Sequence, residues 1–189
     1  MKQAIVVIHN RGNSPWLNDL LTSIDTDYPV LITNHNGWML PAIKKMFDTT
    51  DYDELFFLNE SMIVKDNAIW DIVFKDYEGQ GVAIGDKYLM FLGKYLRKYV
   101  EQTHFPQVNS KRDDVLLGEQ MWNHLYRNAD PYFVQLEVMT DTFEEFEEKH
   151  GRRNMILEGK YFKKWKGSWD IDMVDEVDRR QHEVLTVSS

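Results

Sequence analysis

The first half of the chain alternates short apolar runs with amphipathic segments, and this alternation constrains the fold more than any other feature. The apolar runs, rich in branched and aromatic side chains, lie at 4–8, 30–32 and 55–58. Segments with apolar residues at helical spacing follow them at 15–24, 39–47 and 68–74. Such runs are typical of strands covered on both faces, and strand–helix repeats predict a parallel sheet with right-handed crossovers. We therefore expect an α/β fold, a three-layer sandwich around a central, mostly parallel sheet.

Polar residues stand where each of these three strands would end. They are Asn10 and Arg11, then residues 34–36, then residues 59–61. Ligands of parallel sheets bind beyond the carboxyl ends of the strands, which meet at one edge of the sheet. The sequence thus predicts a binding site that combines the three polar segments.

The second half of the chain is patterned less clearly. Strands are predicted at 82–84 and 131–139, and helices at 110–125 and 141–146. A basic aromatic stretch, Gly159–Trp169, stands out in an otherwise acidic chain. The segment after it carries at most one short helical pattern, and we expect it to be a mobile tail.

The length of 189 residues suits a single domain. We place this domain at 1–169 and divide it into an N-terminal half, 1–78, and a second half, 79–169. The tail then comprises residues 170–189.

The composition excludes several classes of protein. With 31 acidic against 22 basic residues, the formal net charge is −9, which opposes general binding to phosphate backbones. The chain has no cysteine, so a metal site must use carboxylates, histidines, amides or water. It has no apolar run of the roughly 18 to 20 residues that span a bilayer, and no secretory signal pattern. We expect a cytoplasmic protein.

Common motifs of nucleotide-binding and hydrolytic enzymes are missing. The chain contains no Gly-x-Gly-x-x-Gly after the first strand, no P-loop, no Gly-x-Ser-x-Gly and no His-Glu-x-x-His. His9 and His35 fall near the predicted binding edge, but isolated histidines are more often structural than ligands. We therefore assign no histidine to a metal.

Three strand-and-loop units follow one another, at Ile5–Arg11, Val30–Asn36 and Leu55–Val64. Later in the chain, an acidic segment, Asp113–Gln120, lies at the start of a predicted helix. In this order of parts the chain resembles a small GT-A glycosyltransferase, a fold that transfers sugars from nucleotide-sugar donors. The likeness covers roughly residues 3–139. Its main departure is Asn59-Glu60-Ser61, which stands where the family has its metal-binding Asp-x-Asp motif.

The resemblance implies two sites that depend on carboxylates. Mn²⁺ or Mg²⁺ would bridge the donor diphosphate through Glu60 and Ser61, because such ions prefer hard oxygen ligands. Glu119, or Asp114 in its place, would accept the proton of the acceptor hydroxyl as general base. Each residue also has a plain structural interpretation. Glu60 would be an exposed turn residue, and the other two would be carboxylates that complement a helix dipole.

The remaining polar residues would bind donor and acceptor, which makes 1–78 the nucleotide-binding half and 79–169 the acceptor half. The donor is a nucleotide diphosphate sugar, and its nucleotide would meet the loop residues Asn10, Arg11, Asn34 and Asn36. Lys163, Lys164 and Lys166 would close over the diphosphate as a lid, or lie on a solvated strand. Asp86 and Lys87 would contact the sugar or the hydroxyl acceptor.

Two other functions stay open at this point. The missing aspartate pair is compatible with a non-catalytic nucleotide-binding or sugar-binding module on the same fold. A nucleotidyltransferase has a similar sheet, but it would need two or more clustered carboxylates for its metals. The acidic net charge disfavours a nucleic acid as acceptor, and the sequence leaves the donor base, the sugar and the oligomeric state undetermined.

Overall fold

The computed structural model describes residues 1–9, 15–34, 39–85, 90–103, 105, 107, 131–138, 155–166 and 184–187. At the ends of some elements only the backbone is described.

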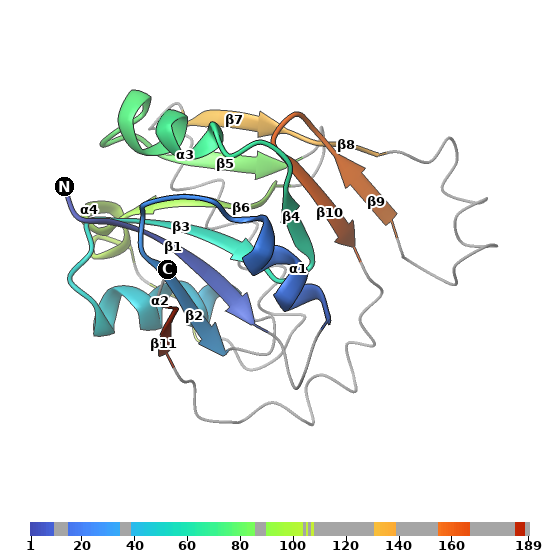
Figure 1. The fold of residues 1–189 in the computed structure, drawn as a ribbon. Helices are drawn as coiled ribbons and strands as arrows, with labels where there is room; N and C mark the ends of the chain where they lie inside the picture. The colour runs from blue at the N-terminus through green and yellow to red at the C-terminus, as the bar shows by residue number, and fades with distance from the viewer. Residues whose placement is uncertain are drawn as a thin grey trace.

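A seven-stranded sheet forms the centre of the described part of the molecule (Figure 1). Its strands are β1 (Gln3–His9), β2 (Val30–Asn34), β3 (Glu54–Asn59), β5 (Val82–Gly85), β6 (Met90–Leu96), β7 (Tyr132–Gln135) and β11 (Val184–Val187). They are hydrogen-bonded in the order β11-β2-β1-β3-β6-β5-β7, and β6 and β11 run against the other five. The prediction of a mostly parallel sheet is confirmed.

A second, smaller sheet is antiparallel throughout its described strands. It consists of β4 (Met62–Val64), β8 (Glu137–Val138), β9 (Met155–Glu158) and β10 (Phe162–Lys166). The strand order is β4-β10-β9-β8. Since β4 follows β3 after only two residues, this sheet is attached directly to the carboxyl end of a central strand.

Short helices and the small sheet cover the two faces of the large sheet. The helices are α1 (Pro15–Ser23), α2 (Met39–Thr49), α3 (Ile69–Asp71), the π-helix η1 (Ile72–Asp76) and α4 (Arg97–Val100). Leu20 of α1, Trp70 of α3 and Phe162 of the small sheet share one core cluster. Met46 of α2 and Val100 of α4 belong to a second cluster. The arrangement has three layers, and the predicted mixed α/β class is confirmed.

The central strand β1 shows why the apolar runs have no polar alternation. Residues 4–8 are at most 1% exposed. Ile5 and Val7 face the cluster that contains α1, whereas Val6 and Ile8 face the cluster that contains α2. Because alternate side chains point to opposite faces and both faces are covered, every position of the strand must be apolar.

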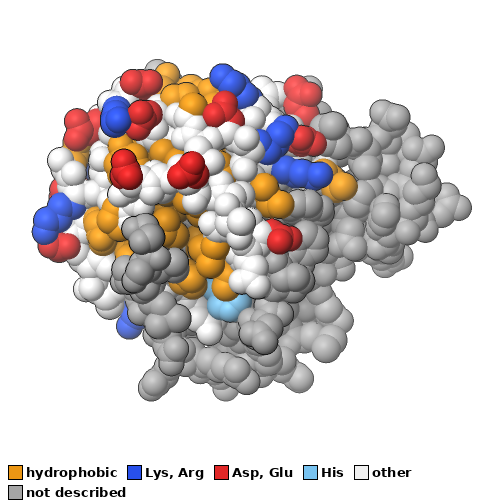
Figure 2. Space-filling model, in the orientation of Figure 1, with side chains coloured by type: hydrophobic (Ala, Val, Ile, Leu, Met, Phe, Trp, Pro, Cys, Tyr) orange, Lys and Arg blue, Asp and Glu red, His pale blue; other side chains and the backbone are white. Residues whose placement is uncertain are grey.

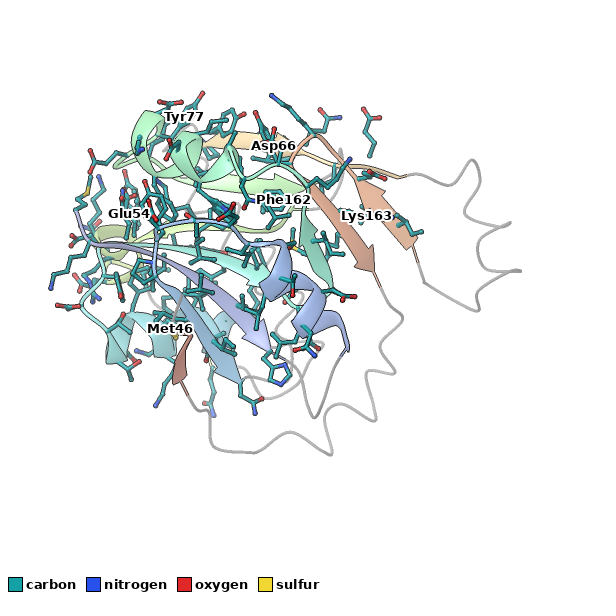
Figure 3. The ribbon with its side chains drawn as sticks, viewed as in Figure 1. Met46, Glu54, Asp66, Tyr77, Phe162 and Lys163 are labelled. Carbon is teal, nitrogen blue, oxygen red and sulfur yellow. The ribbon has the colours of Figure 1, made fainter. Side chains whose placement is uncertain are left out.

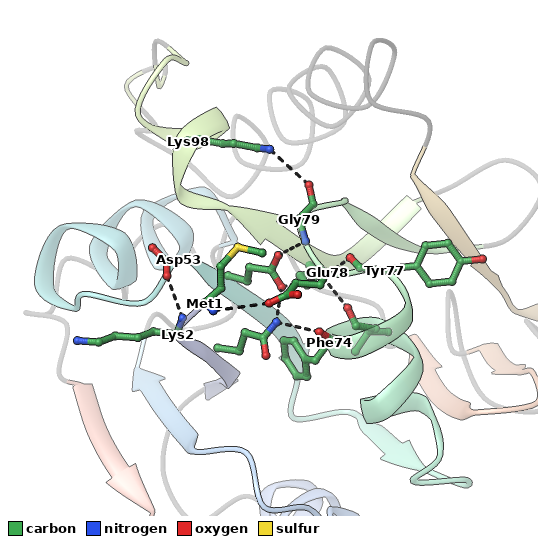
Figure 4. Close-up of polar contacts among 12 residues, drawn as sticks. Met1, Lys2, Asp53, Phe74, Tyr77, Glu78, Gly79 and Lys98 are labelled. Atoms are coloured by element: carbon green, nitrogen blue, oxygen red, sulfur yellow. Dashed lines mark hydrogen bonds and ion pairs between the residues drawn. The ribbon is translucent and has the colours of Figure 1, made fainter.

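A buried ion pair lies near the amino end of β3. Nζ of Lys94 is 2.8 Å from Oε2 of Glu54, and both side chains are 0% exposed. Burial lowers the pKa of Lys94, while its hydrogen bond with Glu54 acts in the opposite direction. Gln3 Nε2 and the backbone N–H of Gly79 also donate to the Glu54 carboxylate. Figure 4 shows the polar contacts at this end of the sheet.

The same lysine contacts the segment at which the helix predicted at 68–74 departs from a regular α-helix. Lys94 donates to the carbonyl oxygen of Val73, which an α-helix would use within the helix. The N–H of Tyr77 instead reaches the carbonyl of Ile72, at 3.0 Å and a spacing of five residues. The segment therefore continues from α3 into a π-helix, a form that occurs mostly as a single turn.

The second half of the chain differs most from the sequence prediction. Residues 90–96, for which no element was predicted, form β6. The strand predicted at 131–139 divides into β7 and β8, which belong to different sheets. Residues 184–187, in the predicted tail, pair with β2 as β11. The helices predicted at 110–125 and 141–146 lie outside the described residues. Among the described residues, no helix is long and apolar enough to cross a membrane.

Arg97 connects the end of α2 to the rest of the domain. Its guanidinium donates to the carbonyl oxygens of Phe47, Thr50 and Tyr52 at 2.7–2.9 Å. We expect Arg97→Met to lower the free energy of unfolding by about 2 kcal/mol, in the range for hydrogen bonds with a charged partner. Urea denaturation measures this loss. Arg97→Lys should recover less than half of it, because an ammonium group lacks the planar fork that reaches three carbonyls. Full recovery by lysine would contradict the assignment.

Candidate functional site

The carboxyl ends of β1, β2 and β3 lie side by side at one edge of the large sheet. His9 is in register with Asn34, and Ile8 with Asn59, so the three strands end together. Strand β2 pairs with one side of β1, and β3, which comes later in the chain, pairs with the other side of β1. This reversal of strand order is the position at which open α/β sheets bind ligands. The edge predicted from the sequence is therefore formed by these strands.

Glu60 is held at this edge by His9. Nδ1 of His9 donates to Oε2 of Glu60 at 2.6 Å, and the two side chains are 15% and 12% exposed. The backbone N–H of Glu60 also donates to the carbonyl oxygen of Ile8 at 3.3 Å. Glu60 is therefore an oriented, largely buried carboxylate, and its interpretation as an exposed turn residue is wrong.

Lys164 reaches the same turn from the other end of the chain. Strand β10 pairs with β4 so that Lys164 is opposite Met62, the first residue after the turn. The Lys164 side chain is 5% exposed, and its Nζ donates to Oγ of Ser61 at 3.3 Å. The antiparallel ladder holds Lys164 in a paired strand, and closure of this strand over a ligand stays a prediction.

Lys163, also predicted to close over the diphosphate, lies on the opposite side of β10 from Lys164 and so does not face Ser61. It is in register with Glu158 of β9, and its charge contributes to lowering the pKa of that carboxyl, after the larger effect of Lys65. Figure 3 shows Phe162 inside the molecule and Lys163 at its outer side. The strand alternation thus sends Phe162 and Lys164 inward and Lys163 outward.

Both signs of charge are present around the small sheet. Figure 2 shows basic and acidic side chains close together there, on a face that also carries hydrophobic patches. Lys65, directly after β4, pairs with Glu158 at the end of β9. Lys65 and Glu158 thus neutralise each other on the outer side of the small sheet, whereas Lys164 points inward to the turn.

Comparisons with models of protein families, with curated proteins and with solved structures found no match to this chain. The functional interpretation therefore depends on the geometry of the site itself. That geometry consists of His9, Glu60, Ser61 and Lys164, with Asn34 and Asn59 at the neighbouring strand ends.

The structure brings together three of the residues predicted from the sequence and leaves others undescribed. Glu60, Ser61 and Lys164 meet at one turn, which follows β3. Asn34 ends β2, which is separated from β3 by β1. For Lys166 only the backbone is described, as the end of β10. The predicted residues outside the described part are Asn10, Arg11, Asn36, Asp86, Lys87, Asp114 and Glu119.

His9 is the residue whose role the sequence prediction missed. It ends β1, while Glu60 follows the end of β3, and the two strands are parallel neighbours. The adjacency of these strand ends was predictable, and a histidine facing a carboxylate is a standard pairing. The sequence prediction considered His9 as a metal ligand or as a structural residue without a named partner, and so overlooked this hydrogen bond.

The described side chains suit an anion better than a metal ion. The site offers one carboxylate, one oxygen of which already accepts from His9, and one hydroxyl, which lies beside an ammonium group. Within the described ranges no group of three His, Asp or Glu residues could hold an ion. Lys164 supplies up to three donors and a positive charge, and Ser61 supplies a hydroxyl donor. Such groups bind phosphate oxygens.

Proposed function

We propose that this protein is a glycosyltransferase of the GT-A type, which transfers a sugar from a nucleotide diphosphate sugar to a hydroxyl acceptor. The observation that carries the proposal is the group formed by Glu60, Ser61 and Lys164 at the carboxyl edge of the sheet. It lies where a ligand of an open α/β sheet binds. It also coincides with the segment at which the GT-A resemblance places the donor diphosphate.

The architecture supports the finer fold assignment without deciding it. Five of the seven described strands in the large sheet run in one direction, and helices pack on both faces. The strand order reverses next to β1, between β2 and β3. A nucleotide-sized ligand bound there would contact Asn34 and, as the resemblance implies, Asn10, Arg11 and Asn36.

The proposed reaction requires stabilisation of a departing diphosphate. The acceptor oxygen forms a bond to the anomeric carbon, and the bond from that carbon to the diphosphate oxygen breaks. The nucleoside diphosphate leaves with the electron pair, and the acceptor proton passes to a general base. Lys164 and Ser61 would stabilise the charge that develops on the leaving oxygen. Glu119 or Asp114 is the base in an inverting reaction by the resemblance, and Asp86 and Lys87 contact sugar or acceptor.

The divalent ion that the resemblance implies remains a prediction, and the described residues fit it poorly. Glu60 and Ser61 would have to hold the ion, yet Ser61 accepts a hydrogen bond from the ammonium of Lys164. No step of the proposed reaction therefore depends on a metal. We also infer a cytoplasmic setting, from the same sequence features that predicted it.

Thermal shift with a panel of nucleoside diphosphates and nucleotide sugars, with and without Mn²⁺, tests this proposal. We expect one nucleoside diphosphate to stabilise the protein. Glu60→Gln should weaken its affinity at least tenfold, since the charge-assisted hydrogen bond with His9 that fixes the turn contributes about 1.5–3 kcal/mol. Glu78→Gln, at the other end of the sheet, is the matched control and should leave the affinity unchanged.

The outcomes separate the candidate functions. Donor hydrolysis or transfer that is lost in Glu119→Gln, with donor binding retained, would support the enzyme and its base. Binding of a nucleotide without any turnover would instead favour a non-catalytic module. Indifference to every nucleotide in the panel would rule out the glycosyltransferase and the nucleotidyltransferase together.

A further inference from the structure

A lysine occupies the place at which the resemblance puts a divalent ion. The turn between β3 and β4 carries Glu60 and Ser61, and Nζ of Lys164 is 3.3 Å from Oγ of Ser61. A cation bound to Ser61 would therefore lie beside an ammonium group. Because Lys164 is only 5% exposed, water screens that repulsion poorly.

The second residue expected to bind the ion is already engaged. Oε2 of Glu60 accepts from His9 at 2.6 Å, and this contact is itself largely buried. A carboxylate fixed in this way helps to hold the turn that carries Ser61. Glu60 thus has one oxygen fewer for a metal.

The position of Lys164 is fixed by three features of its strand. Its backbone is paired with Met62 on one side and with Leu157 on the other. Phe162, two residues earlier on the same side of β10, is fully buried in the core. A lysine held in this way loses little conformational freedom on binding a ligand, which favours affinity.

We propose that the Lys164 ammonium and the Ser61 hydroxyl bind the diphosphate group directly, so that donor binding in this protein needs no divalent ion. The inference rests on the proposed function for the identity of the ligand. The ligand group is a diphosphate. Its oxygens accept hydrogen bonds from the Lys164 ammonium and the Ser61 hydroxyl, and the positive charge of Lys164 balances part of its negative charge.

Inorganic pyrophosphate is the probe, because it contains the diphosphate without any assumption about base or sugar. Isothermal titration calorimetry is carried out on the full chain in EDTA and again with Mn²⁺. We expect binding in EDTA, with an affinity within threefold of that measured with Mn²⁺. Lys164→Met should weaken it at least tenfold, and Ser61→Ala about threefold to fivefold.

Lys163→Gln is the matched control, because it removes one positive charge from the same strand on its outer side. It should change the affinity less than twofold. Far-ultraviolet circular dichroism and the melting temperature of each variant show whether it is folded. Ser61→Ala is a small change at a turn, so it tests the site even if Lys164→Met does not fold.

The results also separate this inference from the proposed function. Pyrophosphate binding that requires Mn²⁺, or binding in EDTA that both Lys164→Met and Ser61→Ala leave intact, would overturn the inference. Sugar transfer with Mn²⁺ would then still uphold the proposed function. Metal-free pyrophosphate binding that Lys164→Met abolishes would support the diphosphate site. If no nucleotide sugar binds in that case, the proposed function is overturned and the diphosphate site is not.

Discussion

Replacing Lys94 by methionine is expected to lower the free energy of unfolding by about 3–5 kcal/mol, the cost of leaving a buried charge without its partner. Lys94 and Glu54 form an ion pair at 2.8 Å with both side chains fully buried. The same ammonium donates to the carbonyl oxygens of Val73 and Tyr77, so its removal also leaves two acceptors of the π-helix region without this donor. Several buried polar groups therefore lose their partner at once.

Urea denaturation of Lys94→Met measures the loss, and Lys75→Met is the matched control. Lys75 pairs with Asp71 at the same distance, 2.8 Å, but both side chains are 65% exposed. Exposed pairs of this kind contribute little, so the control should unfold like the unmodified protein. The double variant Lys94→Met with Glu54→Gln should lose less than the sum of the two single variants. Equal effects at the buried and exposed pairs would contradict the explanation.

Phe162→Ala is the second change from which we expect a large effect, again about 3–5 kcal/mol of stability. The ring of Phe162 stacks against Phe56 of β3 at 6.0 Å between centroids and meets Trp70 of α3 edge-on at 6.2 Å. Truncation to alanine leaves a cavity between the two sheets, and the surrounding core can collapse into it only in part. Since Phe162 is fully buried, its whole side chain contributes to the free energy of unfolding.

The consequence of this change extends to the candidate site. Phe162 anchors β10, and Lys164 lies two residues further along the same side of the strand. Phe162→Ala should therefore weaken pyrophosphate binding as well as stability, even at temperatures where the variant remains folded. Phe133→Ala, at an exposed position on β7, is the control for loss of a phenyl ring. If both variants unfold at the same urea concentration, the packing argument is wrong.

The elements that the sequence predicted well are those with local, repeated patterns. Strand β1 and helix α2 agree with the apolar runs and helical spacing, because a strand covered on two faces must be apolar throughout. The meeting of the polar strand ends also follows from the order of strands and helices alone, since parallel strands end at the same edge. This much of the site was accessible without coordinates.

The elements that it missed depend on partners far away in the chain. Nothing local to Val184–Val187 indicates that it completes the large sheet beside β2. In the π-helix η1 the carbonyl of Val73 accepts from Lys94, which lies on a later strand. Lys164 was predicted to bind the diphosphate, but its place beside Ser61 follows from the pairing of β10 with β4, across about one hundred residues.

By itself the sequence determined the strands β1, β2 and β3, the helices α1 and α2, and the edge at which polar groups gather. These follow from hydrophobic periodicity, which acts over a few residues and is written in each segment. Only the tertiary structure decided which polar groups meet: His9 with Glu60, Lys164 with Ser61, and Lys94 with Glu54. Such contacts depend on register between distant strands, and a shift of one residue would send each of these side chains to the other face.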